Sequence, residues 1–131
     1  MFLMTVEPRF VETDALGHIN NTVLPVWFEQ ARTPIFKFFT PSLAIEEWEL
    51  ILAKIEVSFL HQIYYGQDVQ IKTFIQSLGN SSAVVLHEAW QDKKKVAEGA
   101  AVLVHFDHTT QKSKVIPESI RAMLTEHLVE N

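Results

Sequence analysis

The chain has 131 residues, 47% of them hydrophobic and 21% charged, which suits one packed domain over residues 1–131 and excludes a disordered chain. Its net charge of −5 argues against binding to a nucleic-acid backbone by overall electrostatic attraction. Without cysteine it has no disulfide, thiolate nucleophile or Cys-based metal site, a composition compatible with the cytoplasm, where we expect the protein to reside.

The first segment, residues 2–11, predicts a strand, because its start is too short and too poor in basic residues for a signal peptide. No segment of the sequence approaches the roughly 20 apolar residues of a membrane-spanning helix, so we expect no membrane partner. The strand leads into a polar loop, Glu12 to Asn21, which contains Gly17 and ends in two asparagines that can cap a helix. A helix is therefore predicted to begin near Asn20 or Asn21.

The segment 22–39 is apolar around most of its helical circumference, the pattern of a buried helix. Pro25 fits the first turn of such a helix, but Pro34 falls inside it and removes a backbone donor. The sequence therefore predicts one buried helix whose last stretch is kinked or interrupted. Glu29 and Arg32 are three residues apart, so an ion pair on the helix surface is the simplest interpretation of these two charges.

Four strands and a short helix are predicted after the central helix. The first strand alternates strictly, with Ile51, Ile55 and Phe59 on its apolar face and Lys54 on the other. Turn residues separate the strands that follow. The predicted strands span 51–59, 69–76, 84–90 and 96–106, and the amphipathic helix spans 117–129.

This order of elements predicts how the domain is built. Consecutive strands joined by tight turns pair antiparallel, and one face of such a sheet can be apolar. The apolar face needs a cover, which the long apolar helix can supply. We therefore predict an α+β fold in which a five-stranded antiparallel sheet wraps around a long central helix.

The polar loop also holds the densest group of chemically useful side chains. It precedes the start of the predicted helix, where backbone N–H groups lack partners and the helix dipole favours negative charge. Such a position suits a developing oxyanion, and the neighbouring carboxylate of Asp14 can act as nucleophile or general base. From the residues alone, loop hydrogen bonding by Asp14 and a structural role for His18 remain alternatives.

The loop from Glu12 to Asn21 reads E-T-D-A-L-G-H-I-N-N, and F-E-Q-A-R follows at 28–32. Together they resemble the 4-hydroxybenzoyl-CoA thioesterase family of hotdog-fold proteins. The turn at 65–68 and the pair Ile116-Pro117 extend the resemblance weakly over most of the chain. Leu24 stands where the family commonly has tyrosine, and Pro34 interrupts a helix that the family normally continues.

The resemblance implies a hotdog fold and hydrolysis of an acyl-CoA thioester to a free acid and CoA. It gives catalysis to Asp14, oxyanion binding to the backbone N–H of Asn21, and orientation of the reacting groups to His18 and Asn20. The implied substrate-binding residues are Gly17, Trp27, Phe28 and, from a second subunit, Phe59. No metal or other cofactor is implied, and the expected assembly is a homodimer or homotetramer.

Several alternatives stay open at this point. An enoyl-thioester hydratase of the same fold would need a catalytic histidine with a second acid, and a non-catalytic module that binds acyl-CoA or an acyl carrier protein would keep the loop without turnover. For Glu29 and Arg32 the resemblance adds a role in shaping the pocket or the subunit contact. His105 and Asp107 lack a third metal ligand, so no metal site is expected there. The histidines expected to have no catalytic role are His61 and His87.

Overall fold

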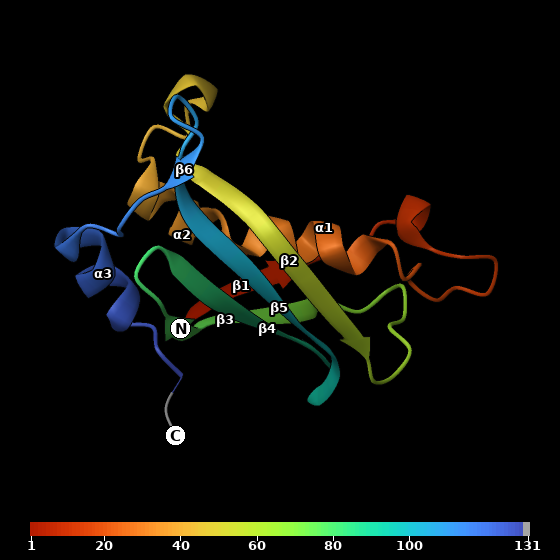
Figure 1. Cartoon of the computed structure of the whole chain (residues 1–131). Helices are drawn as coiled ribbons and strands as arrows, with labels where there is room; N and C mark the ends of the chain where they lie inside the picture. Colours follow the sequence, from red (N-terminus) through yellow and green to blue (C-terminus); the bar gives the residue numbers. More distant parts are fainter. Residues whose placement is uncertain (130–131) are drawn as a thin grey trace.

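The computed structural model describes residues 1–129, in which one curled antiparallel sheet surrounds a central helix (Figure 1). The strands are β1 (Phe2–Val6), β2 (Leu50–Phe59), β3 (Val69–Leu78), β4 (Ser82–Gln91), β5 (Lys94–Asp107) and β6 (Lys112–Ser113). The helices are α1 (Val23–Ala31), α2 (Thr33–Phe39) and α3 (Glu118–Thr125), with short 3-10 helices at Phe10–Glu12 and Ile45–Glu47.

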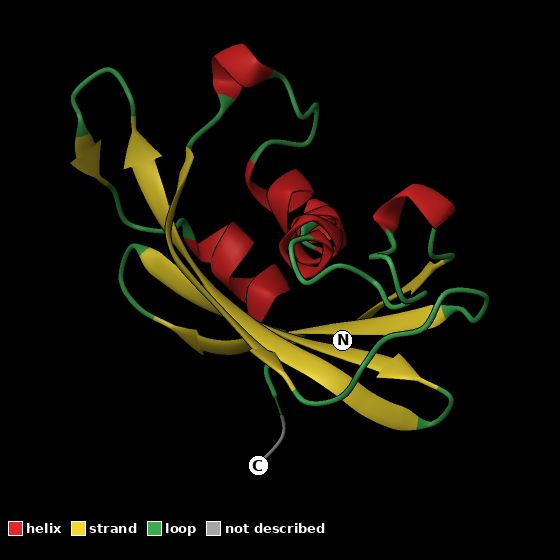
Figure 2. Cartoon of the chain, turned by 90° about the vertical axis from the view of Figure 1, so that its right-hand side faces the viewer, coloured by secondary structure: helices red, strands yellow, loops and turns green. Residues whose placement is uncertain are grey.

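The strands are hydrogen-bonded in the order β1-β3-β4-β5-β2, and the short β6 pairs with β5. Every pairing among these strands is antiparallel, and β1 and β2 form the two edges. The central helix lies on the concave side of the sheet, which curves around it (Figure 2). The predicted hotdog architecture is therefore confirmed.

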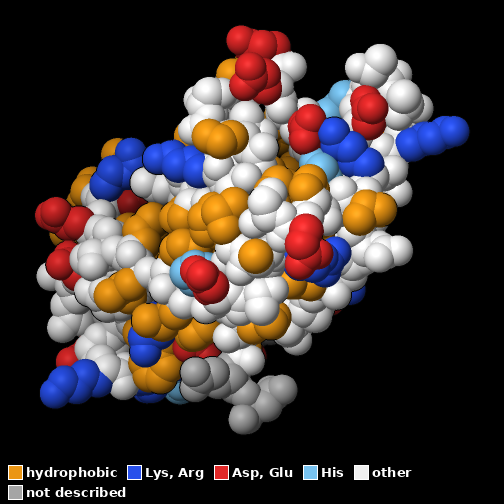
Figure 3. Space-filling model, turned by 90° about the vertical axis from the view of Figure 1, so that its left-hand side faces the viewer, with side chains coloured by type: hydrophobic (Ala, Val, Ile, Leu, Met, Phe, Trp, Pro, Cys, Tyr) orange, Lys and Arg blue, Asp and Glu red, His pale blue; other side chains and the backbone are white. Residues whose placement is uncertain are grey.

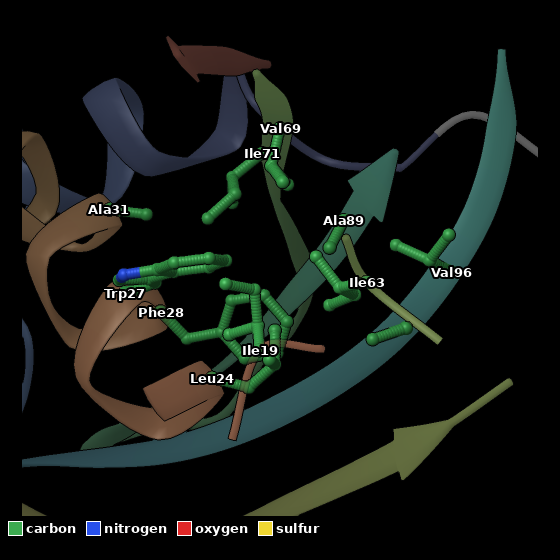
Figure 4. Packing of buried hydrophobic residues seen from close by; sticks show 11 residues of the cluster. Ile19, Leu24, Trp27, Phe28, Ala31, Ile63, Val69, Ile71, Ala89 and Val96 are labelled. Carbon is green, nitrogen blue, oxygen red and sulfur yellow. The ribbon is translucent and has the colours of Figure 1, made fainter. Parts of the chain in front are cut away.

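The apolar residues of α1 recur at spacings of three and four, so they share one face that is directed at the sheet. Leu24, Trp27, Phe28 and Ala31 are all at most 3% exposed. They pack with residues of the sheet, including Ile71, in one core cluster (Figure 4). The contact is close, since a Cβ built on Gly99 of β5 would lie 2.8 Å from the ring of Phe28.

The helix is interrupted at Arg32, between α1 and α2, as the position of Pro34 predicts. Proline has no N–H to donate back to the carbonyl of Gln30. That carbonyl accepts a 2.7 Å hydrogen bond from the hydroxyl of Thr33 instead. Beyond the break, α2 contributes Ile35 to a second core cluster, which includes Leu124 of α3. Hydrophobic side chains also reach the surface on the side where α3 lies (Figure 3).

Some predicted boundaries are wrong for local reasons. The first strand ends at Val6 rather than at residue 11, because Pro8 cannot donate to a sheet and a 3-10 helix follows. The central helix begins at Val23, since the side chain of Asn20 accepts a hydrogen bond from the N–H of Thr22 and forms a turn first. The last helix ends at Thr125, and β6 was not predicted.

The prediction of one buried face along β2 is also wrong. Ile55 is 48% exposed and Phe59 is 52% exposed. A register shift between Leu52 and Lys54 breaks the alternation, as a β-bulge does. Because β2 is an edge strand, most of it is exposed on both faces.

Candidate functional site

Hydrogen bonds to Asp14 close the polar loop into a compact turn. Its Oδ1 accepts from the backbone N–H of Leu16 at 2.7 Å and of His18 at 3.1 Å. Its own N–H donates to the carbonyl of His18 at 2.7 Å. Gly17 lies in this turn with φ of +80°, which glycine adopts without steric cost. The turn fixes the Asp14 carboxylate, whose side chain is 38% exposed and therefore open to a ligand.

The turn is held against the segment that joins β2 to β3. The N–H of Ile19 donates to the carbonyl of Ile63 at 2.7 Å, and the N–H of Tyr65 donates to the carbonyl of Gly17 at 3.2 Å. The ring of His18 packs edge-on against Tyr64, with centroids 5.2 Å apart. This packing leaves Nδ1 of His18 3.9 Å from Oδ2 of Asp14, so the two side chains are neighbours.

The start of α1 presents an unpaired backbone donor. The carbonyl of Asn20 accepts from the N–H of Val23 at 3.0 Å, while its Oδ1 accepts from the N–H of Thr22. Among residues 1–129, nothing accepts a hydrogen bond from the N–H of Asn21. This N–H can therefore bind an external oxygen, and the dipole of α1 favours negative charge there.

A cleft of about 560 Å³ opens beside this donor. It is lined by Ile19, Asn21, Leu24, Phe59, Leu60, His61, Gln62 and Ile63. Asn21 and Phe59 of one chain therefore share the cleft, so their proximity needs no partner subunit. Asp14, Gly17 and His18 do not line the cleft and belong to the turn that leads into Ile19.

Trp27 and Phe28 lie in the core of the chain and do not line this cleft. The indole N–H of Trp27 donates to Glu12 at 2.8 Å. The ring of Phe28 stacks on His87, with centroids 4.8 Å apart and planes at 7°. Within one chain, both rings therefore support α1 from the core side.

Glu12 is part of the site's framework, a role that the sequence analysis missed. It is 7% exposed and accepts hydrogen bonds from the N–H of Arg9 and the indole of Trp27, both at 2.8 Å. Burial alone would raise the pKa of Glu12, but these hydrogen bonds together hold its pKa below the usual value. Its carbonyl accepts from the N–H of Asn20 at 2.8 Å. The only sequence signal for this role of Glu12 is its position two residues before Asp14.

The surface ion pair expected of Glu29 and Arg32 is wrong. In the part of the chain that the structure describes, Glu29 and Arg32 form no ion pair, and Arg32 is 3% exposed rather than on the surface. His87 is also buried, and burial followed by the charge of Arg32 lowers its pKa to about 3. His105 contacts Glu49 at 2.9 Å. Residues 1–129 contain no group of three or more potential metal-ligating side chains.

None of the helices described is long and apolar enough to cross a membrane. The family model of the thioesterase-like superfamily matches residues 8–124. The structure of a predicted thioesterase from Bacillus stearothermophilus is 42% identical, with a TM-score of 0.95 over 99% of this chain and 98% of that one. A thioesterase from Thermus thermophilus, solved with coenzyme A and Zn, is 31% identical, with a TM-score of 0.82 over 93% of this chain and 95% of that one.

A third relative, the uncharacterized protein YsmA of Bacillus subtilis (strain 168), is 26% identical over 114 residues, which are 86% of this chain and 77% of that protein. The family model covers both the turn around Asp14 and the central helix. Together with the curled sheet, these matches give the family: the chain belongs to the thioesterase-like superfamily.

Proposed function

We propose that this protein hydrolyses an acyl-CoA thioester to a free acid and CoA. One observation carries the proposal: the partly exposed carboxylate of Asp14 belongs to a turn that leads directly to the unpaired N–H of Asn21 and an open cleft. The Thermus thermophilus relative, which was solved with coenzyme A, supports CoA as the carrier of the acyl group. Family membership supports thioester hydrolysis.

In the proposed reaction the thioester carbonyl oxygen accepts a hydrogen bond from the N–H of Asn21, which stabilises negative charge on that oxygen. Asp14 either attacks the carbonyl carbon or takes a proton from an attacking water. If Asp14 attacks, the C–S bond breaks to give an acyl–Asp14 anhydride, and a water molecule then hydrolyses the anhydride to the free acid and restores the Asp14 carboxylate. If Asp14 acts as a base, the attacking water adds to the carbonyl carbon, the C–S bond breaks and the free acid forms directly. On both routes the CoA thiolate leaves and takes up the proton that the water gives up. His18 orients Asp14, and the turn formed by Asn20 keeps the N–H of Asn21 free.

The cleft would hold the acyl group against Leu24 and Phe59, while Trp27 and Phe28 support its wall from the core. Gly17 keeps the turn narrow, which would let the thioester approach the backbone. No step of this reaction needs a redox cofactor, because the thioester is already an activated acyl group.

We also propose that the protein forms a homodimer. β2 is an edge strand that exposes Leu52, Ile55 and Phe59, each more than 40%. An exposed apolar edge is a template for pairing with another strand, and a second copy of the chain supplies one. A dimer of dimers is compatible with the same edge.

A thiol-release assay over short, medium, long and aromatic acyl-CoAs tests the proposed function. The wild type should release thiol, and Asp14→Asn should lower kcat/KM by roughly 10² to 10⁴-fold, the usual contribution of a positioned acid or base. Asp68→Asn is a matched control, because Asp68 is also exposed but lies outside the turn. Equal activity of Asp14→Asn and the wild type would refute the proposal.

The same assay separates the alternatives. A hydratase would hydrate enoyl-CoA without releasing thiol. A non-catalytic module would bind acyl-CoA equally in the wild type and in Asp14→Asn, with no turnover in either.

A further inference from the structure

A separate cavity of about 400 Å³, called the β1 pocket below, lies between β1 and the interruption of the central helix. Its walls are mostly apolar and come from both elements: Phe2, Leu3, Met4, Ala31 and Pro34. The other lining residues are Gln30, Thr33, Lys37 and Thr73. The pocket shares no residue with the cleft at Asn21, and β1 is the edge of the sheet opposite β2. Neither the proposed reaction nor the proposed dimer therefore accounts for it.

Hydrogen bonds connect the β1 pocket to the buried Arg32. Thr73 of β3 is fully buried, and its hydroxyl oxygen lies 2.9 Å from Nδ1 of His87. On the other side of the same ring, Nε2 lies 3.2 Å from Nη1 of Arg32. A guanidinium group can only donate hydrogen bonds, so Nε2 of His87 is the acceptor in this contact.

The direction of the remaining bond follows from the charge of the ring. Burial and then the charge of Arg32 lower the pKa of His87 to about 3, so the neutral ring carries one proton. Because Nε2 accepts, that proton is on Nδ1, which donates to the oxygen of Thr73. The hydroxyl hydrogen of Thr73 therefore remains free, and residues 1–129 provide no acceptor for it. The positive charge of Arg32 polarises this chain of hydrogen bonds and makes Thr73 a stronger donor.

The β1 pocket thus combines one buried donor with apolar walls. A buried donor without an acceptor costs free energy, so an oxygen atom from outside the chain is favoured. A neutral oxygen suits this position, because a buried carboxylate needs a counter-ion or several donors and Thr73 offers one. Lys37 is exposed and has the only charge among the described lining residues, so it opposes a cationic ligand.

We propose that the β1 pocket binds a small, neutral, apolar carbonyl compound, such as a ketone or an ester. Its carbonyl oxygen accepts the hydrogen bond of Thr73, and its apolar part packs against Phe2, Met4 and Pro34. The volume of the pocket lies within the usual range of small-molecule sites, roughly 300 to 1,000 Å³. Binding requires no thioester hydrolysis, so the proposal does not depend on the proposed function.

Acetophenone and α-methylstyrene are a matched pair of probes, because a CH₂ group replaces the carbonyl oxygen in the second. Each is titrated into the full chain labelled with carbon-13 at the methionine methyl groups, and NMR follows the signal of Met4 in the pocket wall. Met4→Leu identifies that signal among the three methionines. Acetophenone should shift the Met4 signal saturably at millimolar concentration. An unchanged signal would overturn the proposal.

Thr73→Val tests the donor, because valine has nearly the same shape and lacks the hydroxyl. It should weaken acetophenone binding at least about fivefold, since the carbonyl is then buried without a partner, and should not weaken α-methylstyrene binding. Thr73→Ser keeps the hydroxyl and should bind acetophenone within about threefold of the wild type. Variants are compared for one ligand at a time, because the two ligands differ in hydrophobicity. Equal acetophenone affinities in Thr73→Val and the wild type would overturn the proposal.

Leu3→Ser keeps the test decisive if the buried substitution prevents folding. Leu3 is 59% exposed and lines the pocket, so the loss of its apolar side chain should weaken both probes at least about threefold. Val115→Ser is the matched control, because Val115 is 65% exposed and lies outside the pocket. Equal affinities in these two variants would overturn the assignment of the pocket. Asp14→Asn should bind both probes as the wild type does, and weaker binding would place the ligand at the proposed active site instead.

Discussion

The carboxylate of Glu12 and the indole N–H of Trp27 form a 2.8 Å hydrogen bond that joins the polar loop to the middle of α1. The carbonyl of the same glutamate accepts from the N–H of Asn20, at the far end of the loop. Glu12 therefore fixes both ends of the segment that carries Asp14. The proposed acid or base and the start of α1 are held in register through this one residue.

Glu12→Gln should lower both stability and activity. A glutamine oxygen can still accept one hydrogen bond, but its NH₂ group would face a second N–H donor. We expect a loss of about 1–3 kcal/mol in the free energy of unfolding and a lower kcat with a smaller change in KM. Chemical denaturation and steady-state thiol release measure the two effects. Glu7→Gln is the control, because Glu7 is exposed, and identical behaviour of the two variants would exclude the positioning role.

Acid should destabilise the fold through His87. Its pKa is about 3 in the folded chain, below the ordinary value of 6.5, so the unfolded chain binds the proton first. Its contribution to stability is therefore complete above about pH 6.5 and falls by about 1.4 kcal/mol per pH unit as the pH drops towards 3. NMR titration of the ring gives the folded pKa directly. A folded pKa near 6.5 would contradict this prediction.

Gly99→Ala should destabilise the sheet where it meets α1. An added Cβ would lie 2.8 Å from the carbonyl oxygen of Glu56 and 2.8 Å from the Phe28 ring. Neither the backbone nor a stacked ring can move freely, so we expect a loss of about 1–3 kcal/mol in the free energy of unfolding. Thermal and denaturant unfolding measure it. Ser58→Ala, at an exposed position of β2, should change stability by less than about 0.5 kcal/mol. A similarly small effect of Gly99→Ala would show that the contact relaxes.

Ile55→Lys should convert the proposed dimer into a monomer. A lysine in the middle of an exposed edge strand opposes pairing with another copy, since the charge would be buried in the contact. Sedimentation equilibrium of the wild type and the variant measures the mass. Leu3→Lys is the control, because Leu3 is 59% exposed on the opposite edge strand, β1. If only Leu3→Lys dissociates the dimer, the subunit contact lies at β1 and not at β2.

The elements that the sequence predicted well depend on local patterns. The central helix is apolar over a continuous stretch, the later strands alternate, and Pro34 marks the break. The surroundings of single residues were harder to predict from the sequence, because they depend on contacts between distant segments. Arg32 is buried because it meets His87, 55 residues away, and β2 is exposed because the strand order leaves it at an edge.

In the candidate site, too, the sequence predicts local contacts and misses contacts between distant segments. The turn around Asp14 is visible in the sequence, since its hydrogen bonds span only two to four residues. The cleft cannot be seen in the sequence, because its second wall, Phe59 to Ile63, comes from the end of β2 and the segment that follows it. The role of Glu12 depends on Trp27, 15 residues further along the chain.

The interruption at Arg32 divides the central helix into two halves with separate surroundings. The first turn of α1 borders the cleft at Asn21 through Leu24, whereas later residues of α1, the junction and α2 line a second pocket beside β2. Substitutions in α2 can therefore reshape one cavity while α1 keeps its register against the sheet. A chain built in this way can acquire new ligand preferences at one end without rebuilding the other.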